Sequence, residues 1–274
     1  MTSLPETETL ILEIQDGWLT ISLNRPESRN ALSDEMATEL FAALSSVTND
    51  RTIRGITLRG KNGIFCAGGD LKGFQKSLAG NFSFDDAKTM SQKAGELFAL
   101  INSMPQVVIA MVEGAAIAGG LGMACCADFV VAVEDAKFSL TETMLGISPA
   151  QIAPFVIQRT GQMAARRLML TGARFDGSEA HKLGIVDIVV KTAKEGNAAE
   201  QDIRKNVIRC APGANAITKE IVRATAYMNT DAMIDFAADG FAKCMLGDEG
   251  REGILSFIEK RKPDWAQTNS LDEE

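Results

Sequence analysis

The chain has 274 residues, of which 46% are hydrophobic and 23% charged, with a formal net charge of −8. This length is enough for a full hydrophobic core in one large domain or in a domain with an appendage. The negative charge disfavours a nucleic-acid or anionic-membrane surface, and no apolar run approaches the ~20 residues of a membrane span. The five cysteines lie mostly in apolar runs, which predicts buried, reduced thiols and a cytoplasmic location.

The hydrophobic pattern predicts short strands that alternate with helices, as in an α/β protein. Residues 10–14 and 18–23 alternate apolar and polar side chains around Asp16-Gly17, which is typical of a β-hairpin. Further strands are predicted over residues 53–58, 107–112, 129–133 and 185–190.

Helices are predicted from caps and from apolar periodicity. Ser33 is expected to be the N-cap of a helix. The buried face of that helix is expected to carry Met36, Leu40, Phe41, Leu44 and Val47. Helical patterns also cover residues 85–103, 151–181 and 198–262. Residues 72–84 contain two glycines among polar side chains, which predicts a mobile loop.

Two glycine-rich stretches each follow an apolar strand. The first runs from Ile64 to Lys72 and the second from Glu113 to Gly122. Glycine allows backbone N–H groups to approach a ligand closely, and two such loops facing each other would supply two donors to an oxyanion. Each loop alone is also what a tight turn or close helix packing requires. Neither has the spacing of a phosphate-binding motif.

These loops and their flanks, taken in chain order, resemble the crotonase (enoyl-CoA hydratase/isomerase) superfamily. The matching pieces are Asn24-Arg25-Pro26, Asn30-Ala31-Leu32, Phe65 to Lys72, Glu113 to Asp128, Ala136-Lys137-Phe138, Leu145 to Pro149, Thr171 to Asp176, Leu183 to Val186 and Phe257 to Lys262. Each piece is a weak signal, but their order covers nearly the whole chain.

The resemblance implies a fold and an assembly. Residues 1–197 are expected to form a crotonase-type spiral of ββα turns, and residues 198–274 a C-terminal helical trimerisation region. The expected assembly is a homo-trimer or a hexamer built from two trimers. The apolar side chains expected at its contacts are Ile234, Phe236, Phe241, Met245, Leu246, Ile254, Leu255, Phe257 and Ile258.

The resemblance also implies a reaction, the hydration of an enoyl-CoA thioester. The backbone N–H groups of Gly69 and Gly119 are the expected oxyanion donors, since two donors aimed at the thioester oxygen stabilise an enolate. Glu142 is the expected general acid and base. Read without the family, Glu142 is a glutamate at a helix start beside a Thr141 cap.

The sequence departs from the usual pair of catalytic glutamates because Gly122 occupies the first of the two positions. A missing carboxylate is expected to open volume beside the acyl chain. The segment 148–156, with Gly122 and Cys125-Cys126, looks like bacterial hydratases that act on 3-branched glutaconyl-CoA thioesters. Isohexenylglutaconyl-CoA, from acyclic terpene breakdown, is the favoured substrate, and 3-methylglutaconyl-CoA, from leucine breakdown, is the next.

Coenzyme A is part of the substrate in this interpretation, and no metal or redox cofactor is expected. By resemblance, Gly122 borders the acyl group, and two further sets of residues contact the coenzyme. The first set, within the subunit, is Ala67, Asp70, Leu71, Lys72, Arg25 and Arg29. The second set, reaching in from a neighbouring subunit, is Phe257 and Lys260.

Other functions remain open on the sequence. A Δ3,Δ2-enoyl-CoA isomerase needs only one carboxylate, and hydrolases, decarboxylases and dehalogenases of the superfamily share the oxyanion hole. A non-catalytic or RNA-binding crotonase-like protein is an alternative of another class, against which the acidic charge and the retained Glu142 argue. A Ser–His hydrolase is disfavoured because there is one histidine and no Gly-x-Ser-x-Gly.

Overall fold

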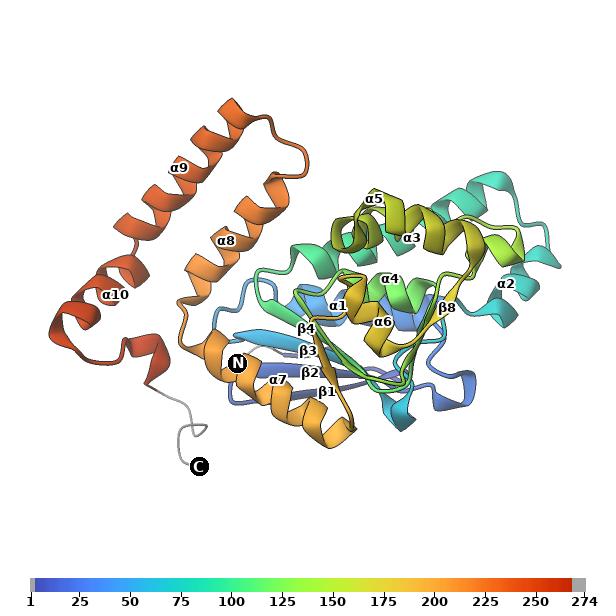
Figure 1. The fold of residues 1–274 in the computed structure, drawn as a ribbon, viewed down its shortest axis with the longest axis horizontal. Coiled ribbons are helices and arrows are strands. Elements are labelled where there is room, and N and C mark those ends of the chain that lie inside the picture. The colour runs from blue at the N-terminus through green and yellow to red at the C-terminus, as the bar shows by residue number, and fades with distance from the viewer. Residues whose placement is uncertain (1–2, 268–274) are drawn as a thin grey trace.

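The computed structural model describes residues 3–267. Residues 1–2 and 268–274, the outer ends of the two predicted regions, lie outside the described residues. Strands and helices alternate along the chain as predicted, and a helical arm follows the core (Figure 1). None of the helices in the described part is both long and apolar enough to span a membrane.

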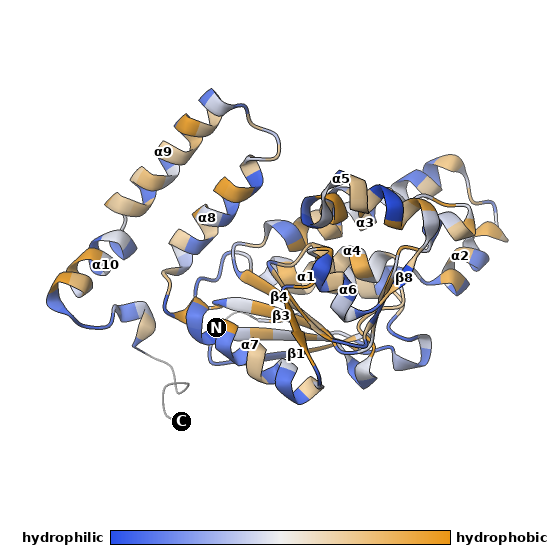
Figure 2. Cartoon of the chain, viewed as in Figure 1, coloured by the Kyte–Doolittle hydropathy of each residue, from blue (hydrophilic) through white to orange (hydrophobic). Residues whose placement is uncertain are grey.

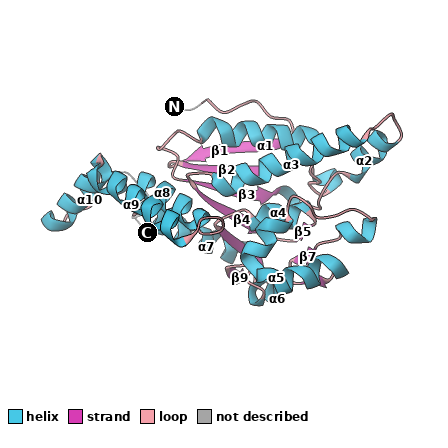
Figure 3. Cartoon of the chain, turned by 90° about the horizontal axis from the view of Figure 1, so that it is seen from above, coloured by secondary structure: helices cyan, strands magenta, loops and turns pink. Residues whose placement is uncertain are grey.

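Six strands form the larger sheet, in the order β1-β2-β3-β4-β6-β9 (Figure 3). They are β1 (Leu10–Gln15), β2 (Trp18–Leu23), β3 (Gly55–Gly60), β4 (Val107–Val112), β6 (Phe129–Val133) and β9 (Ile188–Val190). The predicted hairpin is confirmed, since β1 and β2 pair antiparallel, and the remaining pairs are parallel. The last strand is shorter than predicted because Ile185 and Val186 both donate to the carbonyl of Ala180 in a turn.

A smaller sheet of three strands lies beside the first. It contains β5 (Ala115–Ile117), β7 (Lys137–Ser139) and β8 (Arg174–Phe175). β5 and β7 pair in parallel, and β8 runs antiparallel to β7. The rings of Phe138 and Phe175 stack at 5.8 Å between centroids, which holds β8 against the parallel pair.

The central strands of the larger sheet are buried on both faces, as parallel strands in an α/β fold usually are. Alternate residues of β4 therefore enter two different clusters. Val108, Ala110 and Val112 join the main core, whereas Val107, Ile109 and Met111 pack with Ile203 and Val207 of α7 (Ala193–Ile208). The two-residue period of a strand explains this division.

The helices that cover the other face include α1 (Asp34–Val47), α3 (Phe84–Ser103) and α4 (Gly119–Cys125). The Ser33 cap is confirmed, because its hydroxyl accepts a hydrogen bond of 3.2 Å from the N–H of Met36. The placement of Phe41 on the buried face is wrong. Its side chain is 43% exposed, since residue 41 lies beside the stripe that Leu40 and Leu44 form at helical spacing.

The predicted mobile loop is largely helical. Its first part is α2 (Leu71–Leu78), which Asp70 caps by accepting hydrogen bonds from the N–H groups of Lys72 and Gly73. Two further helices, α5 (Ala153–Thr171) and α6 (Gly177–Lys182), follow the smaller sheet's β7. They replace the single predicted helical stretch, and α5 contains a non-helical residue at Gly161.

The boundary predicted between residues 197 and 198 falls inside α7, which packs on the larger sheet. A polar network ties this helix to the core. Thr57 donates to Glu200 at 2.5 Å and accepts from the indole of Trp18 at 2.9 Å. Arg204 pairs with Glu200 and lies over the Trp18 ring. The arm that leaves the core therefore begins after α7.

The arm consists of α8 (Pro212–Ala224), α9 (Thr230–Leu246) and α10 (Asp248–Glu259). α8 and α9 form a pair that projects from the core, as Figures 1 and 3 show. Figure 2 shows hydrophobic positions along α9 and α10. Of the nine apolar residues that were expected at the contacts of a trimer, eight are exposed and Phe236 is half-buried.

Arg54 fastens this arm at its base. Its guanidinium donates to the carbonyls of Cys210 at 2.5 Å and Ile208 at 3.3 Å, at the end of α7. It also donates to the carbonyl of Trp265 at 3.0 Å, beyond α10. One side chain at the start of a core strand thus contacts both ends of the arm.

The cysteines divide between core and arm, and all five are free thiols. Cys66, Cys125 and Cys126 are buried, as predicted, whereas Cys210 is exposed and Cys244 half-buried. Burial raises the pKa of Cys66 to about 11 and that of Cys125 to about 12. These core thiols therefore stay protonated at neutral pH.

Candidate active site

The candidate site lies where three parallel segments end together. Cys66 pairs in parallel with Ala116, and Ala116 pairs in parallel with Phe138. Parallel segments carry their carboxyl ends to the same edge. Gly69, Gly119 and Glu142 follow those paired residues by three or four positions. The register therefore brings all three predicted catalytic positions to one edge of the smaller sheet.

The two glycine loops contact each other directly. The N–H of Cys66 donates to the carbonyl of Ala115 at 3.0 Å, and the N–H of Ile117 donates to the carbonyl of Cys66 at 2.9 Å. A Cβ at Gly68 would lie 3.0 Å from the Cβ of Ala118. The loops are thus side by side, as the oxyanion interpretation requires.

Ala118 orients the second loop through an uncommon backbone conformation. Its φ is 51° and its ψ is −122°, a region that costs a non-glycine residue about 1–3 kcal/mol. The N–H of Ala118 donates to the carbonyl of Ser139 at 2.8 Å, which fixes the turn onto β7. Gly119 follows as the first residue of α4.

The N–H groups of Gly69 and Gly119 donate no hydrogen bond to any acceptor among residues 3–267, although both glycines are partly buried. Neighbouring groups in the first loop are paired. The N–H of Leu32 donates to the carbonyl of Gly68, and the N–H of Asp70 donates to the carbonyl of Leu32. Two donors are therefore left for a ligand atom at this edge.

Aromatic rings border both donors. A Cβ at Gly69 would lie 2.9 Å from the Cζ of Phe74 in α2, so that a side chain there would collide with the ring. A Cβ at Gly119 would meet, among the described atoms within 4 Å, only the Cζ of Phe98 in α3, at 3.8 Å. Apolar walls exclude water, which strengthens hydrogen bonds made inside the site.

Glu142 begins a short 3₁₀ turn, Glu142–Leu145, that follows β7. The side chain of Thr141 does not cap this turn. The alternative interpretation, in which Glu142 is only a glutamate beside a Thr141 cap, is therefore not supported. The side chain is 9% exposed. Its Oε2 atom has no hydrogen-bond partner within the described chain, and burial raises the pKa of this carboxyl.

Hydrogen bonds to main-chain carbonyls hold the turn that carries Glu142. The hydroxyl of Thr143 donates to the carbonyl of Met169 in α5 at 2.8 Å. The N–H of Ile147 donates to the carbonyl of Glu142 at 3.1 Å. The carboxylate is thus positioned by its main chain while its own oxygen remains available for chemistry.

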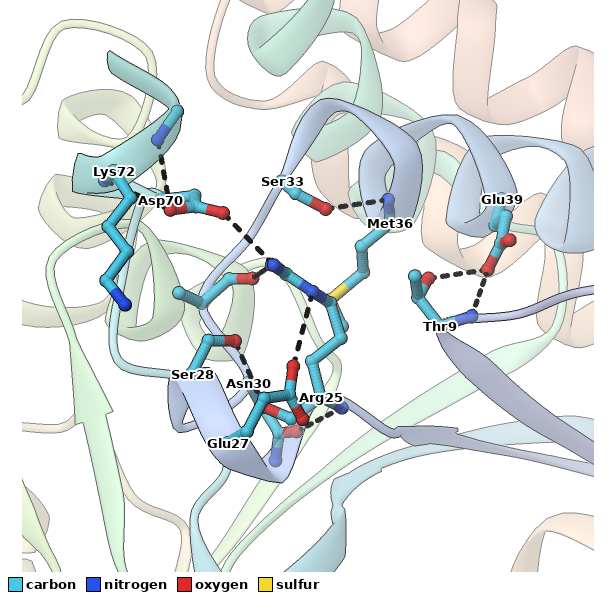
Figure 4. Close-up of polar contacts among 12 residues, drawn as sticks. Thr9, Arg25, Glu27, Ser28, Asn30, Ser33, Met36, Glu39, Asp70 and Lys72 are labelled. Carbon is cyan, nitrogen blue, oxygen red and sulfur yellow. Dashed lines mark hydrogen bonds and ion pairs between the residues drawn. The ribbon is translucent and has the colours of Figure 1, made fainter. Parts of the chain in front are cut away.

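Arg25 and Asp70, both predicted to bind the coenzyme, form an ion pair with each other at 3.1 Å (Figure 4). Arg25 also donates to the carbonyl of Ala31 at 2.8 Å. Burial would raise the pKa of Asp70, but its bonds from Gly73 and Arg25 lower it below its usual value. The structure therefore gives this pair an internal role, which is to hold α2 against the loop before α1.

The remaining coenzyme residues lie in two separate places. Leu71 and Lys72 are exposed on the first turn of α2, next to the half-buried Ala67, and Arg29 is exposed on the neighbouring loop. Figure 4 shows the Lys72 side chain pointing away from Asp70. Phe257 and Lys260 belong to α10 and its end, on the arm outside this site (Figure 1).

The expectation that Gly122 opens space is wrong. Gly122 is fully buried, and a Cβ built on it would lie 2.5 Å from the Cβ of Ile152. Ile152, at 3% exposure, fills the volume where a side chain at position 122 would stand. No carboxylate fits there while Ile152 keeps this position.

A family model described as enoyl-CoA hydratase/isomerase matches residues 13–268. The chain belongs to this family. Human enoyl-CoA hydratase domain-containing protein 2, mitochondrial, is 33% identical over 255 residues, which are 90% of this chain and 85% of that protein. Crotonyl-CoA hydratase of Syntrophomonas wolfei is 29% identical over 260 residues, 93% of this chain and 96% of that protein.

Among solved structures, Pseudomonas aeruginosa AtuE is similar to this chain with a TM-score of 0.92 and 46% identity. The match covers 95% of this chain and 100% of that one. The predicted crotonase fold is confirmed by this likeness. The predicted type of enzyme, an enoyl-CoA hydratase of the lyase class, is confirmed at the level of the family.

Three residues of the candidate site were not predicted from the sequence, namely Phe74, Phe98 and Ile152. A signal for Phe74 was present, because Asp70 is a good N-cap and Leu71, Phe74 and Leu78 follow at helical spacing. Nothing local marks Ile152, whose partner Gly122 is distant in sequence. Within residues 3–267, no three His, Cys, Asp or Glu side chains gather as a metal site.

The buried charge of Glu142 should make the folded protein less stable at neutral pH. Because burial raises the pKa of Glu142 in the folded state, the ionised carboxyl lowers the free energy of unfolding above this raised pKa. The loss disappears below the ordinary pKa of 4.5, where the carboxyl is protonated in both the folded and the unfolded state. We expect Glu142→Gln to unfold at a higher urea concentration than the wild type at neutral pH. Below pH 4.5, the two proteins should unfold at the same urea concentration. Exposed Glu134, before β7, supplies the control Glu134→Gln, which should show no such difference.

Proposed function

We propose that this family member adds water across the 2,3 double bond of an enoyl-CoA thioester and prefers a 3-branched glutaconyl acyl group. The observation that carries the reaction is the convergence of two unpaired N–H groups and one buried carboxylate, whose Oε2 atom has no partner among the described residues, at a single sheet edge. The likeness of Gly122 and segment 148–156 to hydratases of branched glutaconyl-CoA supports the substrate. Isohexenylglutaconyl-CoA is favoured, and 3-methylglutaconyl-CoA comes next.

In this proposal the thioester oxygen accepts hydrogen bonds from the N–H groups of Gly69 and Gly119. The ionised Glu142 takes a proton from water, and the oxygen of that water forms a bond to C3. The electron pair of the double bond moves onto the thioester as an enolate, which the two donors stabilise. Glu142, now protonated, returns a proton to C2, so that one water is added in total.

One carboxylate serves both steps because Ile152 stands where a second would lie. A general acid and base works best when its pKa is close to the working pH. Burial moves the pKa of Glu142 in that direction. The same single carboxylate favours a second candidate, a Δ3,Δ2-enoyl-CoA isomerase, in which Glu142 would move a proton between C2 and C4 and no water would be added.

A panel of thioesters separates these readings. Crotonyl-CoA, 3-methylglutaconyl-CoA, isohexenylglutaconyl-CoA and a 3-enoyl-CoA would be incubated with the enzyme, and the products followed by mass spectrometry. We expect a gain of one water, with the highest kcat/KM for a branched glutaconyl thioester. A much higher kcat/KM for crotonyl-CoA would overturn the substrate, and conversion of the 3-enoyl-CoA without a mass change would favour the isomerase.

Glu142→Gln should retain the shape of the site and lose the proton transfer. General acid–base catalysis contributes about 10²–10⁴-fold, so we expect kcat to fall by at least about a hundredfold. KM should change little, because the proposed donors are backbone groups that the substitution leaves in place. Near-normal hydration by the folded variant would move the chemistry to another residue.

The proposal includes a homo-trimer, or a hexamer of two trimers, assembled through the arm. The exposed fractions of Phe241, Phe257 and Ile258 are 68%, 85% and 70%, which is more apolar surface than a monomer usually leaves in water. In such an assembly, Phe257 and Lys260 would reach the coenzyme of a neighbouring subunit. The cytoplasm is the proposed location, in keeping with the free, buried thiols of the core.

Light scattering at micromolar concentration tests the assembly. We expect the mass of a trimer or of a hexamer. A stable monomer would contradict the proposal and would leave the arm without its proposed role.

A further inference from the structure

We propose that Ile152 determines which acyl groups this enzyme accepts, by standing in for a side chain at position 122. The inference rests on the proposed function and deepens it. Gly122 lies one helical turn after Gly119, and its N–H donates to the carbonyl of Ala118 at 3.0 Å. Ile152 reaches across from the segment before α5 and covers Gly122 with its branched side chain.

The position of Ile152 relative to the donors points to the acyl chain. Gly122 follows the proposed oxyanion donor Gly119 by three residues, a rise of about 4.5 Å along α4, and Ile152 covers Gly122. An acyl group held at the donors and extending along α4 meets Ile152 a few bonds beyond its carbonyl carbon. Branched and unbranched enoyl groups differ in that part of the molecule.

Three apolar side chains lie against glycines of the candidate site, and Ile152 differs from the other two in its position. Phe74 borders Gly69, and Phe98 borders Gly119, so both rings lie beside the reacting carbonyl that every thioester shares. Ile152 lies farther along, where the acyl groups diverge. Its size should therefore affect the choice between substrates more than the reaction common to all of them.

A second contact fixes the segment that carries Ile152. The side-chain amide of Gln151 donates to the hydroxyl of Ser91 in α3 at 3.0 Å. Gly95, one turn along α3, leaves room for that amide, because a Cβ there would lie 2.8 Å from the Cδ of Gln151. Gly95 and Gly122 thus receive two successive side chains from one segment, and Ile152 has little freedom to move aside.

The test compares kcat/KM for isohexenylglutaconyl-CoA with kcat/KM for crotonyl-CoA. In Ile152→Ala, the vacated space should raise this ratio by about tenfold, since a methyl-sized change in an apolar pocket changes selectivity by 10–200-fold. Ile152→Val should raise it less, and it keeps the test valid if the alanine variant does not fold. The double variant Gly122→Ala/Ile152→Ala returns a methyl group to the space and should lower the ratio again.

Val156 supplies the matched control. It is fully buried in the main core, one turn along α5 from Ile152. Val156→Ala should lower the urea midpoint of unfolding while leaving the ratio unchanged. A ratio that moves equally in the Val156 and Ile152 variants would overturn the inference, because it would then reflect loosened packing.

The urea midpoints provide a readout that does not depend on substrate. Gly122→Ala alone should lower the urea midpoint strongly, because its methyl group would collide with Ile152. Adding Ile152→Ala to the same chain should restore part of the lost midpoint. A wild type that turns over neither thioester would overturn the proposed function and this inference with it. Wild-type turnover with an unchanged ratio in both Ile152 variants would overturn the inference alone.

Discussion

The parallel register of Cys66, Ala116 and Phe138 is the constraint on which the site depends. Each of these residues lies three or four positions before a predicted catalytic group, so the pairing sets the position of all three groups at once. A slip by one residue would send the following side chains and N–H groups to the opposite face. The strained backbone of Ala118 and its bond to Ser139 hold the middle segment in register.

The site combines unsatisfied groups that an ordinary core would avoid. Two backbone donors and one carboxylate oxygen lack partners within the described residues, and buried polar groups are normally paired. The surroundings compensate with many fixed contacts, among them Asp70 with Arg25, Thr143 with Met169, and Gln151 with Ser91. Rigid support around unpaired groups is what preorganised electrostatic stabilisation requires.

Local patterns in the sequence predicted the elements that depend on local physics. The apolar run of β4, the hairpin at Asp16-Gly17 and the Ser33 cap each follow from neighbouring residues. The glycine loops and Glu142 were identified through a resemblance, because no single spacing distinguishes them from turns and caps. The occupation of Gly122 by Ile152 could not be predicted, since packing between residues 30 apart leaves no periodic trace. The short helix α2 was predicted as a loop because two glycines among polar side chains in residues 72–84 outweighed the Asp70 cap.

The hydrogen bonds that Arg54 donates to both ends of the arm affect the order in which the chain folds. The bond from Arg54 to the carbonyl of Trp265 joins residues 211 positions apart, so it closes only after almost the entire chain has left the ribosome. Contacts of such long separation form late, because the loop they close is entropically costly. The core can therefore be complete before the apolar arm is anchored to it. An arm that is synthesised last exposes its apolar helices to neighbouring nascent chains for the shortest time, which limits aggregation during synthesis.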